Sequence, residues 1–305
     1  MLNKIIAVAG PTASGKTSLA IEIAKRVDGE VVSCDSMQIY KGMNIGTAKP
    51  DSDEMCGIPH HMLDFVEPDT SYSVADFAAD ARAAIDEVLS RRKVPVIAGG
   101  TGLYMDSVLN NIRFGDFESD PRLREELTLL AEQEGNDAVH KLLQEADPEA
   151  AEKIHPNNVR RVIRAIEVCR ATGKTFTQVN AESRQEPVYN ALIFGIETDR
   201  EVLYDRINLR VDKMMEKGLL DEVKGFFEKG LSLDTTAMQA IGYKELFEYL
   251  RGECSLSESV EKIKQESRRY AKRQLTWFRR NPEINWVSLE NSEKIFEKCY
   301  EFLGK

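Results

Sequence analysis

The residues best suited to chemistry form a short run near the start of the chain, Gly10-Pro11-Thr12-Ala13-Ser14-Gly15-Lys16-Thr17. This run matches the phosphate-binding pattern G-x-x-x-x-G-K-[ST] at every fixed position. In such a loop, backbone N–H groups and a helix N-terminus surround a di- or triphosphate, Lys16 adds a positive charge, and the Thr17 hydroxyl can bind Mg²⁺. An apolar stretch of strand length precedes the loop at residues 5–9, and a helical pattern follows at 18–27. These flanks favour a phosphate loop over a chance glycine turn.

A second candidate is Asp35, which follows an apolar strand expected at residues 30–34. Ligands of open α/β sheets bind beyond the carboxyl ends of the strands. Asp35 is therefore expected on the same rim as the phosphate loop, at the end of a neighbouring strand. Asp is also common in turns and at helix N-caps, and position alone leaves both roles open.

A third candidate is Thr101, in the run Gly99-Gly100-Thr101-Gly102 that ends a strand expected at residues 94–98. A typical P-loop ATPase or GTPase ends one such strand with an Asp that holds magnesium. Here the strand ends in glycines and a threonine. Thr101 is expected to open a helix and to project its hydroxyl into the cleft, and a plain N-cap role is compatible with this.

The elements around these residues predict an α/β protein, with a P-loop-kinase-like parallel sheet flanked by helices. Further strands are expected at 188–196 and 284–287, and helices from Ser73, which opens a capping box with Asp76, from Asp199, and over 234–250. Between residues 115 and 187 only amphipathic helical patterns occur, so this segment is interpreted as an all-helical insertion. The expected division is 1–114 for the first part of the core, 115–187 for the insertion and 188–305 for the second part.

Composition limits the class of protein. The chain has 305 residues, and its five cysteines are scattered without a C-x-x-C pair, which favours reduced thiols in the cytoplasm over a structural zinc site. No apolar run approaches the roughly 20 residues of a membrane span, so no membrane association is expected. The adjacent His60 and His61 lack metal-ligand spacing, and we interpret them as structural.

The charge is unevenly distributed. The whole chain carries −10, but residues 158–174 carry +4 and residues 262–280 carry +7, so the remainder carries −21. The arginines of the first window lie off the apolar stripe of their helix. Two basic faces are the footprint of a polyanion such as nucleic acid, although a solvated helix face is the usual explanation of such charge.

Seven motifs in order give the chain a family resemblance. They are Gly10–Thr17, Asp35-Ser-Met-Gln-Ile-Tyr40, Ile45-Gly-Thr-Ala-Lys-Pro50, Gly57-Ile-Pro-His-His61, Gly99-Gly-Thr-Gly-Leu-Tyr104, Met214-Met-Glu-Lys-Gly-Leu219 and Gln239-Ala-Ile-Gly-Tyr-Lys244. With this set, nearly the whole chain resembles the tRNA dimethylallyltransferases, also called tRNA isopentenyltransferases, of the bacterial type. No motif departs from the family pattern.

The resemblance implies transfer of a dimethylallyl group from dimethylallyl diphosphate to the exocyclic amine of the adenine 3′ of the tRNA anticodon. It implies Asp35 as general base, Thr101 as its partner at the amine, and Mg²⁺ on Thr17. Diphosphate contacts carry over onto Gly10, Pro11, Thr12, Ala13, Ser14, Gly15, Lys16, Thr17 and Arg210. Contacts to tRNA carry over onto Asp35, Ser36, Met37, Gln38, Thr101, Arg124, Arg160, Arg161, Arg164, Gln239, Gly242, Tyr243 and Lys244. A cytoplasmic monomer acting on the anticodon stem-loop is expected.

This chemistry needs such residues. Negative charge grows on the diphosphate as its bond to the allylic carbon breaks. Preorganised N–H groups and cations stabilise that charge. The adenine amine is a weak nucleophile, so a carboxylate that accepts its proton assists the attack, and the base must be flipped out of its stack to reach the cleft.

Three alternatives stay open from the residues themselves. A phosphate loop with a nearby Asp35 also suits a small-molecule kinase that consumes ATP. A prenyltransferase acting on free adenine nucleotides would share the core chemistry, and the basic insertion argues for tRNA instead. A non-catalytic RNA-binding protein could use a nucleotide only structurally.

Overall fold

The structure is a computed structural model that describes residues 2–113, 120–183 and 185–305. Its chain divides into two compact units, one of residues 1–109 and 187–305 and the other of residues 110–186. The junction expected at residues 114–115 lies outside the described residues. None of the helices in the described ranges is long and apolar enough to cross a membrane.

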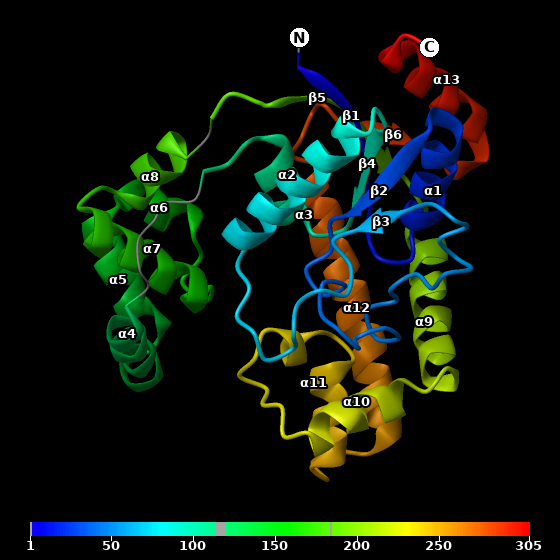
Figure 1. The fold of residues 1–305 in the computed structure, drawn as a ribbon. Coiled ribbons are helices and arrows are strands. Elements are labelled where there is room, and N and C mark those ends of the chain that lie inside the picture. The colour runs from blue at the N-terminus through cyan, green and yellow to red at the C-terminus, as the bar shows by residue number, and fades with distance from the viewer. Residues whose placement is uncertain (1, 114–119, 184) are drawn as a thin grey trace. The chain divides into compact units, whose positions relative to one another are not determined.

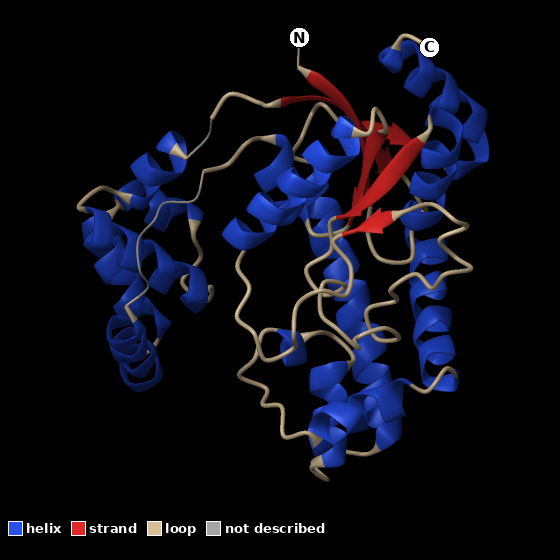
Figure 2. Ribbon diagram, in the orientation of Figure 1, coloured by secondary structure: helices blue, strands red, loops and turns tan. Residues whose placement is uncertain are grey.

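A parallel sheet forms the centre of the first unit (Figures 1 and 2). Within the described residues its strand order is β3-β2-β4-β1-β5-β6. The strands are β1 (Asn3–Ala9), β2 (Gly29–Ser33), β3 (His60–His61), β4 (Val94–Gly99), β5 (Tyr189–Ile196) and β6 (Asn285–Val287). The five expected strands are therefore confirmed, and β3 is an edge strand that the sequence pattern did not predict.

One expectation about the sheet is wrong. Asp35 does not follow the strand next to β1, because β4 lies between β1 and β2 and pairs with both. The register aligns Ala9 with Gly99, and the N–H of Cys34 donates to the carbonyl of Ala98 at 2.8 Å. The segment after β4, which contains Thr101, therefore lies between the phosphate loop and Asp35 on one rim of the sheet.

Alternate residues of the strands face two apolar layers, as expected for strands buried on both faces. Ile6 and Val8 belong to the layer with α1 (Lys16–Val27) and α13 (Ser292–Leu303). Ile5 and Ala7 belong to the layer on the other face. Helices of this second layer are α2 (Val74–Ser90), α3 (Gly102–Leu109), α9 (Arg200–Glu216), α10 (Leu219–Glu228), α11 (Tyr243–Leu250) and α12 (Leu256–Phe278). Short 3₁₀ turns occur at Ala237–Gln239 and Leu289–Asn291.

Local sequence explains several of the helix starts and one break. The predicted capping box at Ser73 and Asp76 forms, and Asp199 caps α9 with its side chain. The helix expected over 234–250 is interrupted, which corrects that prediction. Gly242 has φ of 99°, which ends helical geometry before α11, and its N–H donates to the Glu245 carboxylate at 2.7 Å. Residues 240–242 thus form a turn between the 3₁₀ turn at Ala237–Gln239 and α11.

The second unit has its own apolar core, which contains Leu127, Val139, Leu143, Val162 and Ile166. Among its described residues the helices are α4 (Pro121–Glu134), α5 (Asn136–Ala146), α6 (Pro148–Lys153), α7 (Val159–Thr172) and α8 (Phe176–Glu182). The two shortest, α6 and α8, were not anticipated from the periodicity.

Hydrogen bonds join the two ends of the second unit. The Asn111 side-chain amide donates to the carbonyl of Glu186 at 2.9 Å, and the N–H of Arg113 donates to the carbonyl of Ser183 at 2.8 Å. The segment that enters this unit and the segment that leaves it therefore run side by side.

Close packing at the end of β4 predicts the effect of a single methyl group. A Cβ on Gly99 would lie 2.0 Å from the carbonyl oxygen of Cys34, which is backbone and cannot swing away. Gly99→Ala should therefore destabilise the protein by about 3 kcal/mol, at the upper end for overpacked cores. The midpoint of urea unfolding measures this effect.

Gly225→Ala is the matched control. It lies inside α10 with nothing within 4 Å of its added Cβ, so the change should stabilise the helix by about 0.5–1 kcal/mol. An unchanged midpoint for Gly99→Ala would contradict the close approach of β2 and β4.

Candidate active site

The phosphate loop spans the turn between β1 and α1. Gly15 has φ of 90°, which favours glycine, and α1 begins at the next residue, Lys16. Ser14 is fully buried and its hydroxyl has no hydrogen-bond partner among the described residues. The Thr12 N–H donates to Oε1 of Gln274 at 2.9 Å. The loop thus has the form expected of a phosphate cradle, but a side chain from α12 also holds it.

Two partly buried cations and one carboxylate lie close enough to affect one another. Burial lowers the pKa of Lys16 to about 8; the nearby Asp35 carboxylate opposes this shift and Arg210 adds to it. Burial also lowers the pKa of Arg210, and Asp35 partly offsets that shift too. The sequence placed these three residues at one site, and the structure brings them together.

Asp35 lies in a turn directly after β2. Its Oδ1 accepts from the N–H groups of Met37, at 2.9 Å, and Gln38, at 3.4 Å. Thr101 lies beside this turn, where its Oγ1 accepts from the N–H of Ser36 at 3.1 Å and is 3.3 Å from the Ser36 hydroxyl oxygen. Thr101 therefore positions the turn that carries Asp35. The carbonyl of Thr101 also accepts from the Met105 N–H in the first turn of α3.

A cavity of about 320 Å³ opens beside these groups. Its polar wall contains Lys16, Thr17, Asp35 and Arg210, and its apolar wall is formed by Ile207, Val211, Met214, Leu219, Ile241 and Ile263. Expected site residues that also line it are Thr12, Ser36, Met37, Gln38, Gln239, Gly242 and Lys244. One cavity therefore offers cationic, carboxylate and apolar surfaces together.

A second cavity of about 700 Å³ shares Lys16, Thr17, Arg210 and Met214 with the first. Ala13 and Gly15 line it from the phosphate loop, and Asn44, Ile45, Ala48, Lys49 and Pro50 line it from the glycine-rich loop. The two cations therefore stand where the cavities meet.

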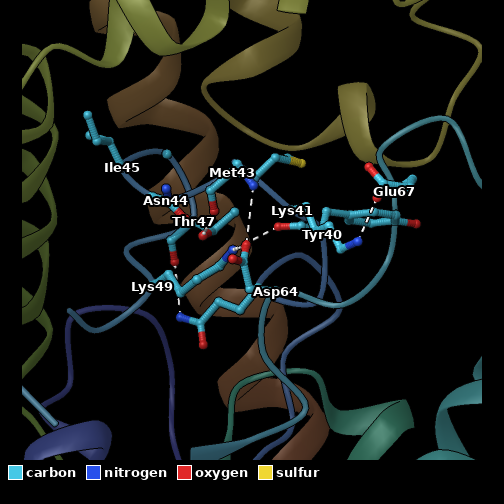
Figure 3. A network of polar contacts seen from close by, with 12 residues as sticks. Tyr40, Lys41, Met43, Asn44, Ile45, Thr47, Lys49, Asp64 and Glu67 are labelled. Atoms are coloured by element: carbon cyan, nitrogen blue, oxygen red, sulfur yellow. Dashed lines mark hydrogen bonds and ion pairs between the residues drawn. The ribbon is translucent and has the colours of Figure 1, made fainter. Parts of the chain in front are cut away.

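Residues of the segment 44–50 line one cavity or the other. Figure 3 shows polar contacts made by this segment and its neighbours. The Glu222 carboxylate on α10 accepts from three successive backbone N–H groups, those of Asn44, Ile45 and Gly46, at 2.9, 2.8 and 3.0 Å. The Lys49 ammonium donates to the carbonyl of Tyr40 at 2.7 Å and also pairs with Asp64. The Glu222 carboxylate therefore fixes the backbone at the start of this segment, and the Lys49 ammonium fixes its end.

Some expected contact residues are occupied inside the protein. The Gln38 amide donates to the carbonyls of Thr47 and Ala48 at 3.2 and 3.1 Å and accepts from the Ser33 hydroxyl. Tyr243 is fully buried, and its hydroxyl donates to Glu222. Both side chains therefore support residues 44–50 in this structure. Four further expected residues, Gly10, Pro11, Ser14 and Thr101, are not among the residues that line the cavities.

Sequence reasoning missed Tyr270, Gln274 and Glu222. Burial raises the pKa of Tyr270 to about 12, with a contribution from the Asp35 charge, while a hydrogen bond with Thr101 opposes the shift. Gln274 is 5% exposed. Tyr270 and Gln274 are four residues apart and share a face of α12. Their spacing was visible in the sequence, but the basic residues around them drew the interpretation toward a polyanion-binding face.

The basic face expected over residues 262–280 needs correction. Lys262 pairs with Glu248 at 2.6 Å, Lys264 with Asp212 at 2.7 Å and Arg269 with Glu266 at 2.6 Å. Acidic side chains on neighbouring helices, and Glu266 on α12 itself, partly neutralise these cations. The helix therefore presents less positive charge than its formal total.

The second unit presents arginines as expected. Arg160, Arg161, Arg164 and Arg170 are all exposed on α7. Arg164 and Arg124 also approach Glu167, a buried carboxylate, at 3.6 and 2.8 Å. Arg124 and Arg164 therefore already have an anionic partner.

No group of three or more His, Cys, Asp and Glu residues within the described ranges could hold a metal ion. His61 instead contacts the buried Glu30 carboxylate at 2.6 Å, and all five cysteines are free. An Mg²⁺ ion at Thr17 would take one protein hydroxyl, with its other ligands from phosphate oxygens and water, which is the usual pattern for Mg²⁺ on nucleotides.

A phosphate loop between a parallel strand and a helix, at the carboxyl rim of the sheet, defines a P-loop protein. The profile of the IPP transferase family matches residues 38–281. The chain belongs to this family.

Known proteins are similar over almost the whole chain. The tRNA dimethylallyltransferase of Acetivibrio thermocellus is 52% identical over 99% of this chain and 98% of its own length. That of Bacillus subtilis is 51% identical over 93% of this chain and 90% of its own length.

Solved structures agree. The tRNA isopentenylpyrophosphate transferase of Bacillus halodurans is 44% identical, with a TM-score of 0.75 over 99% of this chain and 97% of that chain. A eukaryotic dimethylallyltransferase acting on tRNA is 30% identical, with a TM-score of 0.84 over 99% of this chain and 80% of that chain. The predicted fold class and family are therefore confirmed.

The lowered pKa of Lys16 predicts how pyrophosphate binding depends on pH. Lys16 is charged below about pH 8 and loses its proton as the pH rises through that value. The dissociation constant of pyrophosphate should therefore rise above pH 8, by up to about tenfold per pH unit. Calorimetric titration from pH 6 to 10 measures this dependence.

Lys16→Arg provides the comparison, because an arginine stays protonated over this range. Its titration should retain only the weaker pH dependence of pyrophosphate itself. Identical alkaline limbs in wild type and Lys16→Arg would show that Lys16 does not titrate at the site.

Proposed function

We propose that this chain transfers a dimethylallyl group from dimethylallyl diphosphate to the exocyclic amine of the adenine 3′ of the anticodon in tRNA, releasing diphosphate. The observation that carries the proposal is one cavity in which Lys16, Arg210 and Asp35 meet beside an apolar wall. Cations suit a leaving diphosphate, the apolar wall suits a five-carbon chain, and a carboxylate suits a proton acceptor. The dimethylallyl transfer for which the relatives are named requires the same three environments.

In the proposed reaction, the bond between the allylic carbon and the diphosphate oxygen breaks, and a bond from that carbon to the adenine nitrogen forms. The electron pair of the broken bond remains on diphosphate, where the loop N–H groups, Lys16 and Arg210 stabilise it. Asp35 accepts the proton that the amine loses. Bound Mg²⁺ on Thr17 would neutralise further charge on the diphosphate.

The turn that carries Asp35 would also bind the adenine. Ser36, Met37 and Gln38 line the cavity directly after the base. Thr101 supports this turn through Ser36 and is the proposed partner of Asp35 at the amine. Gln239, Gly242 and Lys244, which lie just before α11 and in its first turn, border the cavity and would contact the RNA beside the flipped base. Tyr243 would have an indirect role: its hydroxyl donates to Glu222, which holds the backbone of residues 44–46.

Beyond the flipped base, we propose that Arg124, Arg160, Arg161 and Arg164 of the second unit contact tRNA phosphates. Of these, Arg160 and Arg161 are the better candidates, because the other two also approach Glu167. The protein is further proposed to act as a monomer in the cytoplasm, where its tRNA substrates are found.

The direct test is incubation with labelled dimethylallyl diphosphate, Mg²⁺ and bulk tRNA, followed by nucleoside analysis. Label should appear in a modified adenosine. Asp35→Asn should lower kcat by about 100- to 10,000-fold while the affinity for tRNA and for diphosphate is retained. Full activity in Asp35→Asn would remove Asp35 from the role of base.

The same assay separates the other candidate functions. Turnover of ATP with a small acceptor would indicate a kinase, and label in free adenine nucleotides but not in tRNA would indicate a different acceptor. Binding of tRNA without any transfer by the wild type would indicate an RNA-binding protein.

The arginines of α7 allow a separate test of tRNA binding. Arg161→Ala should weaken tRNA binding at every salt concentration and lower the slope of log K against log salt by about one. Lys141→Ala, an exposed charge change on α5, is the control. Equal effects of both substitutions would mean that only the net charge matters and that α7 has no specific contact.

A further inference from the structure

One face of α12 contacts three segments at or beside the active site. The Tyr270 side chain forms a hydrogen bond with Thr101, Gln274 accepts from the phosphate loop, and the Trp277 indole N–H donates to Asp106 on α3 at 2.8 Å. These residues follow one another at helical spacing along the face. A helix distant in sequence therefore connects three segments of the site.

Gln274 makes the most specific of these contacts. Its Oε1 accepts from the N–H of Thr12 at 2.9 Å, and its Nε2 donates to the carbonyl of Gly100 at 2.9 Å. The side chain is 5% exposed. A single buried amide thus joins the phosphate loop to the turn that contains Thr101, with its oxygen as acceptor and its nitrogen as donor.

The glycines around Thr101 provide an independent observation. A Cβ on Gly100 would lie 2.2 Å from Nε2 of Gln274, and a Cβ on Gly102 would lie 2.2 Å from the Trp277 ring. Neither glycine has a positive φ. The absence of a Cβ at these glycines therefore leaves room for Gln274 and Trp277 of α12, which pack directly against the Gly-Gly-Thr-Gly backbone.

We propose that Gln274 is a positioning residue that sets the phosphate loop relative to the turn of Thr101. This inference rests on the proposed function, since it assigns Gln274 a role in binding the diphosphate of the donor. Thr12 and Lys16 are in one loop, so a shift of the Thr12 backbone also moves the groups that surround the anion. Through Thr101 and Ser36, the same amide supports the turn that carries Asp35.

The test compares Gln274→Met with Gln265→Met. Methionine has a similar length and no charge, and it removes the hydrogen bonds of the Gln274 amide to Thr12 and Gly100. Gln265 lies on the same helix and is exposed, so its substitution is a matched control. A second variant, Gln274→Glu, keeps an acceptor for Thr12 but replaces the donor to Gly100 by a carboxylate oxygen.

The first readout is calorimetric binding of inorganic pyrophosphate with Mg²⁺, beside binding of tRNA. Both Gln274 variants should weaken pyrophosphate binding by about tenfold or more, as expected for losing one or two hydrogen bonds that hold a charged site. Affinity for tRNA should change less than about twofold, and kcat should fall together with a raised KM for the donor. A role in overall stability alone would not produce this separation.

The second readout is amide hydrogen exchange in the free protein, which does not depend on any substrate. Peptides that cover residues 10–17 and 99–103 should exchange faster in Gln274→Met than in Gln265→Met, with the rest of the sheet unchanged. Unaltered exchange and pyrophosphate affinity in Gln274→Met would overturn the proposal. Weaker binding in Gln274→Glu alone would also overturn it, since added charge would then be the cause.

These readouts separate this inference from the proposed function. A wild type that modifies tRNA, with Gln274 variants that match the control, would reject only the role of Gln274. A wild type without prenyl transfer would reject the function, while the exchange data would still decide whether Gln274 holds the loop.

Discussion

The structure depends on placing two positive charges in partly desolvated positions at the rim of a parallel sheet. Burial lowers the pKa of both Lys16 and Arg210, so their desolvation is only partly offset by Asp35. A cavity of this kind is electrostatically incomplete until an anion enters. Anion binding therefore stabilises the charged form of Lys16, and the folded protein gains stability in the presence of its ligand. The apolar wall beside these charges replaces part of their polar surroundings, and electrostatic interactions are stronger in less polar surroundings.

The surrounding fold is organised to hold these groups at fixed distances. β4 lies between the strands that precede the phosphate loop and Asp35, and its glycine-rich end leaves room for β2 on one side and α12 on the other. Glu222 fixes residues 44–50 through three backbone N–H groups. The rigid core thus comes from the sheet, while the helices of the second layer supply the polar contacts that shape the cavity.

The sequence predicted what is encoded locally. The phosphate loop, the strands and the capping box at Ser73 follow from neighbouring residues, and the ordered motifs led to the family. The position of β4 between β1 and β2 was not predicted, because strand order depends on contacts between distant segments. Gln274 is separated from Thr12 by 262 positions, so no spacing rule connects them. The break before α11 was missed because the apolar period continues through Gly242. Pairing of Lys262 and Lys264 with acids was likewise invisible, since it requires knowing which helices are neighbours.

Two hydrogen bonds, between Asn111 and Glu186 and between Arg113 and Ser183, bear on how the second unit is inserted into the chain. The chain segments that enter and leave this unit are held together by these hydrogen bonds. Connecting the two segments directly with a short loop would therefore cost little conformational entropy. The second unit is therefore separable as a module: a short linker across its base could replace it without stretching the sheet. A change in the size of this module would therefore leave the residues at the rim of the sheet in place.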